Sequence, residues 1–373
     1  MLTESTRQAD FPSLSGKSYF NTAAEGIPPT VVLDALRQYG QDKLLGMDGR
    51  DRHAVVWENA KQQLANAYGL SPNEVGLCSC SSEAYNLAAM ALQLREGDEV
   101  VINDLDFPAG STPWLHPSCP ATVKLWRARD WALRVEDLVP LLSPRTRLVT
   151  SSLVSFFNGH QINLPEMIAA VRRHSPSLVS LDVTQALGRI PLDLSDVDLI
   201  ISSTHKWILA THGGGLVGVP SASADRLTAP AGGWFHLENA FGSERFQRAI
   251  PKSGAASFSV GMPNYPAVYA IEAGLKYIES IGVQAIDMHC KPLVRRCIDE
   301  LKKLPVRLIT PDEPEHIAGI VAFMHPDAER IYAALHEQDI HVMCHAGRLR
   351  VAIHGYNDEA SVDRLIDVLR KTL

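Results

Sequence analysis

The sequence lacks the features of a secreted, membrane-spanning or nucleic-acid-binding protein. Its six cysteines among 373 residues are scattered and too few for a disulfide framework. No apolar stretch approaches the roughly 20 residues that span a bilayer, and Met1–Phe11 do not resemble a signal peptide. The formal net charge is −7 without a basic run, which argues against a nucleic acid partner. We therefore expect a cytoplasmic protein with reduced thiols that binds neither membrane nor nucleic acid.

Two groupings of cysteine or histidine suggest a metal site only superficially. Cys78 and Cys80 have no second Cys/His pair at zinc-type spacing near them, so we interpret them as small residues of a buried strand. His341 and His345 are four residues apart, as on one face of a helix, but their segment has strand-like character. We expect no metal site.

Short apolar runs alternate with helix-length segments between about residues 74 and 220. They are short, often β-branched and not strictly alternating, which is typical of strands buried on both faces. The runs are Glu74–Cys80, Glu99–Ile102, Thr122–Trp126, Arg147–Thr150, Leu178–Leu181, Val197–Ile201 and Gly215–Val219. This alternation predicts an α/β domain with a mostly parallel sheet.

The pattern changes after about residue 255. Two long helices, two short strands and a closing helix are predicted, in the order Pro263–Ile281, Val283–Leu304, Gly319–Phe323, Leu349–Ile353 and Glu359–Leu373. Because these elements lack the strand–helix alternation, they indicate a separate and smaller α+β unit. We therefore expect a large domain over residues 17–255 and a small domain over residues 256–373 that also includes residues 1–16.

Two chemically active residues follow predicted strands in the large domain. Asp182 comes directly after Leu178–Leu181, and Lys206 comes shortly after Val197–Ile201 with Gly213–Gly215 behind it. Because open α/β sheets bind ligands at the carboxyl ends of their strands, both side chains are expected at one edge of the sheet. Taken alone, such a pair is more often a simple ion pair than a cofactor site.

Pyridoxal 5′-phosphate (PLP) chemistry requires this pair. The lysine forms an imine with the aldehyde of the cofactor, and the carboxylate keeps the ring nitrogen protonated so that the ring accepts electrons from the substrate's Cα. Free N–H groups at the start of a helix suit the phosphate of the cofactor. Ser81 and Ser82 stand at such a position, because they open an apolar helix after a strand. Taken alone, this helix start is more simply explained as a capping box.

Several motifs occur in an order that resembles the class V aminotransferases, which include cysteine desulfurases, kynureninases, isopenicillin-epimerase-like proteins and related C–S lyases. The resemblance covers nearly the whole chain, and the Asp-x-x-Gln and Ser-x-His-Lys motifs at this separation are specific. The motifs are Tyr19–Gly26, Gly97–Val100, Asp106–Ala109 with Pro113 and Trp114, Asp182–Gln185, Ser203–Trp207 and Leu349–Asn357.

The resemblance implies a role for each matching residue on the cofactor side. Lys206 would hold PLP as a Schiff base, and Asp182 would be the partner of the pyridine nitrogen. Gln185 would bond the phenolic oxygen of the ring. Phe107 would stack on the ring, at the position where desulfurases have a histidine. The phosphate would be held by Ser81, Ser82, Ser203 and His205.

The resemblance also implies the substrate side and the fold. Arg350 would bind the α-carboxylate of an L-amino acid through its planar fork, with Asn21 also on the substrate side; the alternative is a surface arginine on an edge strand. The implied architecture is PLP fold type I, with a mostly parallel seven-stranded sheet in the large domain and a small α+β C-terminal domain. A two-fold homodimer is expected.

Three departures separate the chain from the desulfurases. Their mobile loop with a nucleophilic cysteine is missing, and Cys344 lies only six residues before Arg350, so we prefer a structural thiol to a sulfur relay there. Phe156 stands where desulfurases have an asparagine, with Asn158 close by. Met262 stands where many relatives have a threonine that reaches the phosphate of the partner subunit, a bond that methionine cannot make.

The missing cysteine loop, together with Phe107 and Met262, places the chain nearer the epimerase-like and C–S lyase branch than the desulfurases. The preferred reaction is β-elimination or C–S cleavage on a cysteine derivative, followed by transamination and then by racemisation or decarboxylation. Two other classes stay open, a non-catalytic PLP-binding protein and an enzyme with an aldolase-type Schiff base that lacks PLP. The first would not need both Lys206 and Arg350, and the second would leave Asp182 and the helix-start serines without a purpose.

Overall fold

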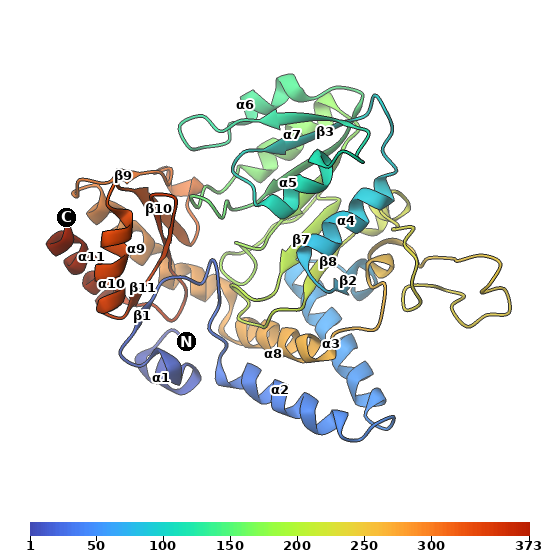
Figure 1. Ribbon diagram of the computed structural model, residues 1–373, viewed down its shortest axis with the longest axis horizontal. Helices are drawn as coiled ribbons and strands as arrows, with labels where there is room; N and C mark the ends of the chain where they lie inside the picture. The colour runs from blue at the N-terminus through green and yellow to red at the C-terminus, as the bar shows by residue number, and fades with distance from the viewer.

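A seven-stranded sheet forms the centre of the protein in the computed structural model, which describes residues 1–373 apart from the side chain of Glu315. The strand order is β2-β8-β7-β6-β5-β3-β4, and β8 alone runs antiparallel to its two neighbours (Figure 1). All seven predicted strands occur, as β2 (Val75–Cys78), β3 (Glu99–Asn103), β4 (Thr122–Trp126), β5 (Thr146–Ser152), β6 (Leu178–Asp182), β7 (Leu199–Ser203) and β8 (Gly215–Gly218).

Helices cover both faces of this sheet. Val100 and Val101 are neighbours on β3 yet belong to different buried clusters, because successive side chains of a strand point to opposite faces. The cluster around Val100 receives α4 (Ser81–Leu92) and α5 (Pro108–Leu115). The cluster around Val101 receives α3 (Arg50–Tyr68), α7 (Leu164–His174) and α8 (Tyr265–Ile281). Burial on both faces explains the continuous apolar runs of these strands.

A second, smaller sheet has the order β12-β13-β10-β9 and is antiparallel throughout. Its strands and helices, which include β9, β10, α9, α10 and α11 in Figure 1, surround a separate buried cluster. The bounds are β9 (Arg307–Leu308), β10 (Ile320–Met324), β12 (Met343–His345), β13 (Arg348–Ala352), α9 (Val283–Leu301), α10 (Ala328–Glu337) and α11 (Glu359–Thr372). The predicted strands and closing helix of this region are therefore confirmed.

The N-terminal segment packs against the small domain. β1 (Ser18–Tyr19) pairs in parallel with β11 (Ile340–His341), and Met1 and Phe11 lie in the same buried cluster as the small sheet. The remaining helices are α1 (Glu4–Asp10), α2 (Thr30–Lys43) and α6 (Val135–Leu138). Since His341 and His345 lie on separate strands, they share no helical face. None of the described helices has the length and apolarity needed to cross a bilayer.

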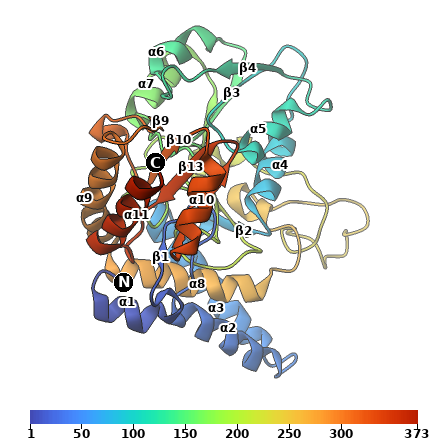
Figure 2. The same ribbon diagram turned by 60° about the vertical axis from the view of Figure 1, so that its left-hand side comes forward.

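The position of the domain boundary stays a proposal. Packing supports the grouping of residues 1–16 with the small domain. The first part of α8, residues 267–275, packs in the large-domain cluster beside α2 and α3, whereas Ile278 belongs to the second cluster (Figures 1 and 2). This packing favours a boundary inside α8, later than the predicted residue 255.

A buried ion pair joins the two domains. Arg189, in the loop after β6, is fully buried, and its Nη1 donates to Asp287 Oδ1 on α9 at 3.1 Å. Its Nε donates to the carbonyl of Ile353 at 2.9 Å. Asp287 also pairs with Lys291 at 2.9 Å, but Lys291 is largely exposed. Removing one member of a buried pair leaves the other charge uncompensated, whereas an exposed pair contributes little.

We predict that Asp287→Ala lowers the free energy of unfolding by about 3–5 kcal/mol, because Arg189 then stays buried without a counter-charge. Lys291→Ala, which breaks only the exposed pair of the same carboxylate, should cost less than about 1 kcal/mol. Urea denaturation followed by circular dichroism measures both. Equal losses for the two variants would show that the Arg189 contact does not hold the domains together.

Candidate active site

The predicted catalytic residues meet at the carboxyl edge of the large sheet. β6 ends at Asp182, and β7 beside it ends at Ser203, three residues before Lys206. They line one cavity with side chains from three further segments of the chain. The lining residues are Ser81, Phe107, Ser152, Phe156, Asp182, Thr184, Gln185, Ser203, His205 and Lys206. Seven of the predicted site residues are therefore brought together, and Ser82, Asn21 and Arg350 lie outside this lining.

Asp182 is buried and held by two hydrogen bonds. The backbone N–H of Thr184 donates to its Oδ1 at 2.7 Å, and the hydroxyl of Tyr85 on α4 donates to its Oδ2 at 3.1 Å. A carboxylate that accepts two such bonds keeps a defined orientation at low solvent exposure. Its geometry suits a fixed negative charge next to a cationic ring nitrogen.

Lys206 lies in an environment that disfavours its charged form. Burial lowers the pKa of its amine to about 8, and Arg350 acts in the same direction while Asp182 opposes the shift. The amine lies 5.3 Å from the ring centroid of Phe107. Gly26 packs directly on this turn, since a Cβ there would come within 2.0 Å of the Lys206 carbonyl oxygen. The pKa of Lys206 therefore lies well below that of an ordinary lysine, so a larger fraction of its amine is neutral near neutral pH.

The start of α4 forms the third corner of the cavity. Its N-cap residue Cys80 makes no side-chain capping bond, and Gly215 on β8 allows close approach, since a Cβ there would meet the Cys80 backbone at 2.4 Å. Ser81 faces the cavity. The free N–H groups and dipole of a twelve-residue helix favour an anion at this point. Ser82 is exposed and does not line the cavity, so its predicted phosphate contact lacks support.

His205 and Gln185 are both oriented by their neighbours. Burial lowers the pKa of His205 to about 4, with Lys206 acting in the same direction, so its imidazole is neutral and retains one N–H donor. Gln185 donates to the carbonyl of Ala23 at 3.0 Å and accepts from the indole N–H of Trp207 at 2.6 Å. Its amide still has one N–H to offer.

Asn21 lies beside the strand of the small domain that carries Arg350. Asn21 bridges to Ala352 on β13, the strand that carries Arg350. The Arg350 side chain donates to the Phe156 carbonyl at 2.8 Å. Within the described residues, Asn21 Oδ1 and Arg350 Nε are buried without hydrogen-bond partners. Because β13 lies between β12 and β10 and Arg350 is only 3% exposed, the alternative of a surface arginine on an edge strand is wrong.

Comparison with known proteins agrees with this architecture. The family pattern described as Aminotransferase class-V matches residues 18–365. The chain belongs to the class V aminotransferase family. The predicted family and the type I fold are thereby confirmed.

Individual relatives of this class V protein carry different names. An uncharacterised aminotransferase, YcbU of Bacillus subtilis (strain 168), is 27% identical over 100% of this chain and 99% of its own. A probable cysteine desulfurase of Pasteurella multocida (strain Pm70) is 25% identical over 95% and 89%. A solved structure of a lysine-to-alanine mutant of C-DES, with glycine covalently linked to the PLP cofactor, matches with a TM-score of 0.87 and 25% identity. The match covers 98% of this chain and 99% of the C-DES chain. C-DES is also described as a cystine C–S lyase, in complex with its product cysteine persulfide.

The residues of this class V protein fit PLP. The group needs an amine, a carboxylate and an anion cradle at fixed separations on one cavity, and Lys206, Asp182 and the uncapped start of α4 provide them. Ser81, Ser203 and His205 would hold the phosphate. Phe107 would cover one face of the ring, with Gln185 beside its oxygen substituent. The unpartnered Asn21 and Arg350 atoms would face the substrate.

Four lining or supporting residues received no role from the sequence. Ser152 ends β5 directly beside Asp182, with which it pairs in the sheet, and Thr184 accepts from the Ser203 N–H at 3.0 Å. The Ser152 hydroxyl donates to Asp106, and burial raises the pKa of Asp106 to about 7, with Asp182 adding to the shift. The fourth is Tyr85, the donor to Asp182. Of these four residues, only Ser152 has a signal in the sequence that could have indicated a place in the site, because it lies at a strand end.

Glu25 and His212 also lie beside the cavity without having been singled out. Their side chains pair at 3.2 Å, and the His205 ring stacks on His212 at 4.4 Å between centroids. Ligand atoms of these three residues lie within 4.8 Å of one another, an arrangement that a metal ion can use. Glu25 also places a negative charge near Lys206, which favours the charged amine. The expected absence of a metal stays a prediction.

The residues that depart from the desulfurase pattern separate into two groups. Phe156 lines the cavity and packs edge-on against Phe107 at 5.1 Å. Asn158 is buried, and its amide donates to the carbonyls of Trp131 and Ile309, so it supports the loop and does not face the cavity. The phenyl ring of Phe156 therefore takes the place of a polar group on this side of the site.

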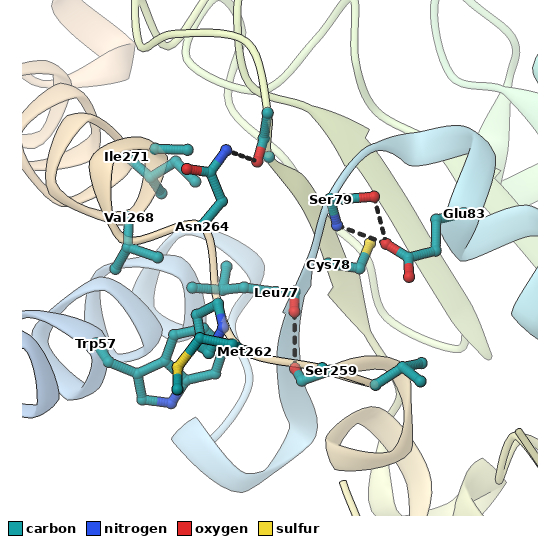
Figure 3. A pocket seen from close by; sticks show the side chains of 16 residues that line it. Trp57, Leu77, Cys78, Ser79, Glu83, Ser259, Met262, Asn264, Val268 and Ile271 are labelled. Atoms are coloured by element: carbon teal, nitrogen blue, oxygen red, sulfur yellow. Dashed lines mark hydrogen bonds between the residues drawn. The ribbon is translucent and has the colours of Figure 1, made fainter. Parts of the chain in front are cut away.

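Met262 lies at a second pocket, shown in Figure 3 beside Trp57 and Ser259. Cys78 and Glu83 face the same pocket from β2 and α4, where Glu83 accepts from the Ser79 N–H at 2.6 Å. Met262 is 47% exposed and offers no hydrogen-bond donor there. The interpretation of Cys80 as part of a buried strand is wrong, because Cys80 is the exposed N-cap of α4 and only Cys78 belongs to β2.

Cys344 points away from the cavity. On β12 it pairs with Leu349, whereas its neighbours Met343 and His345 pair with Arg350 and Arg348, so its side chain lies on the opposite face of the small sheet. There it packs against the buried cluster, and burial raises its pKa to about 11. A thiol of this kind is a poor nucleophile at neutral pH, in agreement with the preferred structural role.

We predict that the Lys206 amine of the cofactor-free protein titrates near pH 8. Only the neutral amine reacts with an acylating reagent, so modification of Lys206 should reach half its maximal rate near pH 8, against about 10.4 for lysine in the unfolded chain. Asp182→Asn should lower the midpoint further, because Asp182 favours the charged amine. Mass spectrometry of the Lys206 peptide after pulse labelling measures this, and a midpoint near 10 in folded protein contradicts it.

Proposed function

We propose that this class V protein is a PLP-dependent C–S lyase that cleaves the Cβ–S bond of an L-cysteine derivative by β-elimination. The observation that carries the proposal is the cavity at the sheet edge, which Lys206 and Asp182 both line and in which no lining residue is a cysteine. The names of the Pasteurella relative and of C-DES support chemistry at a C–S bond. The net reaction is an S-substituted cysteine and water giving pyruvate, ammonia and a thiol.

Each step of this chemistry is assigned to a side chain of the chain itself. When bound, PLP supplies an electron sink for the substrate's Cα. The neutral Lys206 amine removes the Cα proton, since its lowered pKa places it near the operating pH. Asp182, fixed by Thr184 and Tyr85, maintains the negative charge that the cofactor ring requires. Arg350 binds the α-carboxylate through its planar fork.

In this proposal the sulfur leaves together with its substituent, as a thiolate. A desulfurase transfers sulfur to a thiol of the enzyme, and Cys344 points to the opposite face of the small sheet. The remaining route is departure of the substituted thiolate from Cβ, which needs no nucleophile from the protein. The apolar ring of Phe156 suits an apolar part of the substrate next to the leaving sulfur. A polar side chain at this position would suit it less well.

Amino-group transfer is the second candidate, because the Bacillus relative that matches the full chain is named an aminotransferase. Both reactions begin with removal of the Cα proton by the same lysine. They differ in their products, since transfer yields a keto acid that keeps its sulfur substituent. Product identity therefore decides between them.

A homodimer and a cytoplasmic location also belong to this proposal. The loop over about residues 230–250 extends from the large domain in Figure 1. It carries Phe241 and Phe246, which are 82% and 89% exposed. Exposed aromatic side chains on a protruding loop are typical of a subunit interface, which supports the dimer.

We predict that the holoenzyme converts S-substituted L-cysteines to pyruvate and the corresponding thiol in equal amounts. Asp182→Asn should fold normally but lose about a hundredfold or more in rate, equivalent to ~2.7 kcal/mol of transition-state stabilisation, because an amide carries no negative charge. Mass spectrometry with a coupled pyruvate assay measures both quantities. A keto acid that retains the sulfur substituent, formed together with an amino acid from an added keto acid, would instead establish aminotransferase activity.

We further predict that Arg350→Lys raises the KM for amino acids by about tenfold or more, because a charged hydrogen bond contributes about 1.5–3 kcal/mol and lysine lacks the planar fork. The absorbance of the bound cofactor should stay unchanged. S-ethylcysteamine, which has no carboxylate, is the matched control ligand, and its dissociation constant should not change. Equal KM values for wild type and variant would show that Arg350 does not bind the carboxylate.

A further inference from the structure

Two arginines lie side by side on the face of the small sheet that contacts the loop after β5. Arg348 and Arg350 are two residues apart on β13, so their side chains leave the same face, roughly 6.6 Å apart along the strand. The intervening Leu349 and the following Val351 point into the buried cluster on the other face. Both arginines are almost completely buried, at 4% and 3% exposure.

Neither guanidinium receives a counter-charge from the part of the chain whose side chains are described. Among the side chains that the structure describes, neither forms a salt bridge; Arg350 donates to the Phe156 carbonyl and Arg348 to the Phe157 carbonyl. Arg189 shows how this protein buries a purely structural arginine, since Asp287 neutralises it at 3.1 Å. A buried charge without such a partner is costly. Two adjacent buried guanidinium charges of this kind point to anionic groups of a ligand.

Arg348 is connected to the active site through the loop after β5. Its guanidinium lies 4.0 Å from the ring centroid of Phe157 and 5.7 Å from that of Phe156. Phe156 lines the cavity that contains Lys206 and packs against Phe107. Arg350 lies near enough to Lys206 to affect its titration. Arg348 therefore lies on the same face of β13 as Arg350, two residues along the strand and further from the Lys206 amine.

We propose that Arg348 recognises a second anionic group of the substrate, so that the preferred substrate is an L-cysteine derivative whose sulfur substituent ends in a carboxylate or a sulfonate. This inference rests on the proposed function, in which Arg350 binds the α-carboxylate. The separation of the two arginines matches that between an α-carboxylate and an acidic group a few bonds beyond the sulfur. Arginine suits this role because its planar fork binds such oxyanions with two parallel hydrogen bonds.

A merely structural role for Arg348 makes a different prediction. If Arg348 only supports Phe157 and its loop, its replacement affects every substrate to the same extent. If it recognises an anion, its replacement affects anionic substrates selectively. Two ligands of nearly equal size separate these cases, S-carboxymethyl-L-cysteine and its neutral amide, S-carbamoylmethyl-L-cysteine.

The test measures the dissociation constants of both ligands for the holoenzyme, from the change in cofactor absorbance, together with kcat/KM from product formation. We expect wild type to prefer the carboxymethyl ligand by about tenfold or more. Arg348→Met should reduce this preference to about one, with affinity for the amide within about twofold of wild type. Arg348→Lys, which keeps the charge but loses the fork, should retain part of the preference.

Controls keep the outcomes distinguishable. Arg307→Met removes an exposed arginine that stacks on Trp131 from β9 of the same sheet, and it should leave the preference unchanged. Circular dichroism checks folding, and Arg348→Lys carries the test if Arg348→Met does not fold. Equal losses for both ligands, or no preference in wild type, overturn the proposal. Failure of the proposed function appears differently, as binding without pyruvate formation, while the binding preference still tests Arg348.

Discussion

The rest of the site depends on one constraint. An amine and a carboxylate are confined at the ends of two neighbouring parallel strands. β6 and β7 run side by side, so Asp182 at the end of one lies close to the turn that carries Lys206 after the other. Burial disfavours the charge on Lys206, and Asp182 partly restores it. The amine is thereby kept near the protonation balance that proton transfer requires.

Other parts of the large domain are arranged around this pair. Gly26 packs on the Lys206 carbonyl and Gly215 on the Cys80 backbone, at distances that exclude a side chain. These contacts bring the N-terminal segment and the start of α4 to the same edge as the strand ends. The anion cradle and the amine then lie on one cavity, although they come from segments more than a hundred residues apart in the sequence.

In the proposed function the small domain supplies the substrate-binding arginines, so the orientation of the two domains matters. Arg348 and Arg350 both donate to carbonyls of the loop after β5, which itself lines the cavity through Phe156. Arg189 and Asp287 hold the domains together at a second point. The proposed elimination is compatible with this cavity, because departure of a thiolate needs no cysteine in the lining.

The sequence by itself determined the seven buried strands, the two strand-end residues Asp182 and Lys206 and the family, because apolar periodicity and motif order are local properties of the chain. It also indicated Arg350, though not its burial. Tertiary structure alone decided the rest. Ser82 faces solvent, the first half of α8 belongs to the large-domain core, and Arg348 is buried beside Arg350. The physical reason is that side-chain exposure and charge pairing depend on contacts between segments far apart in the chain, which periodicity and spacing do not encode.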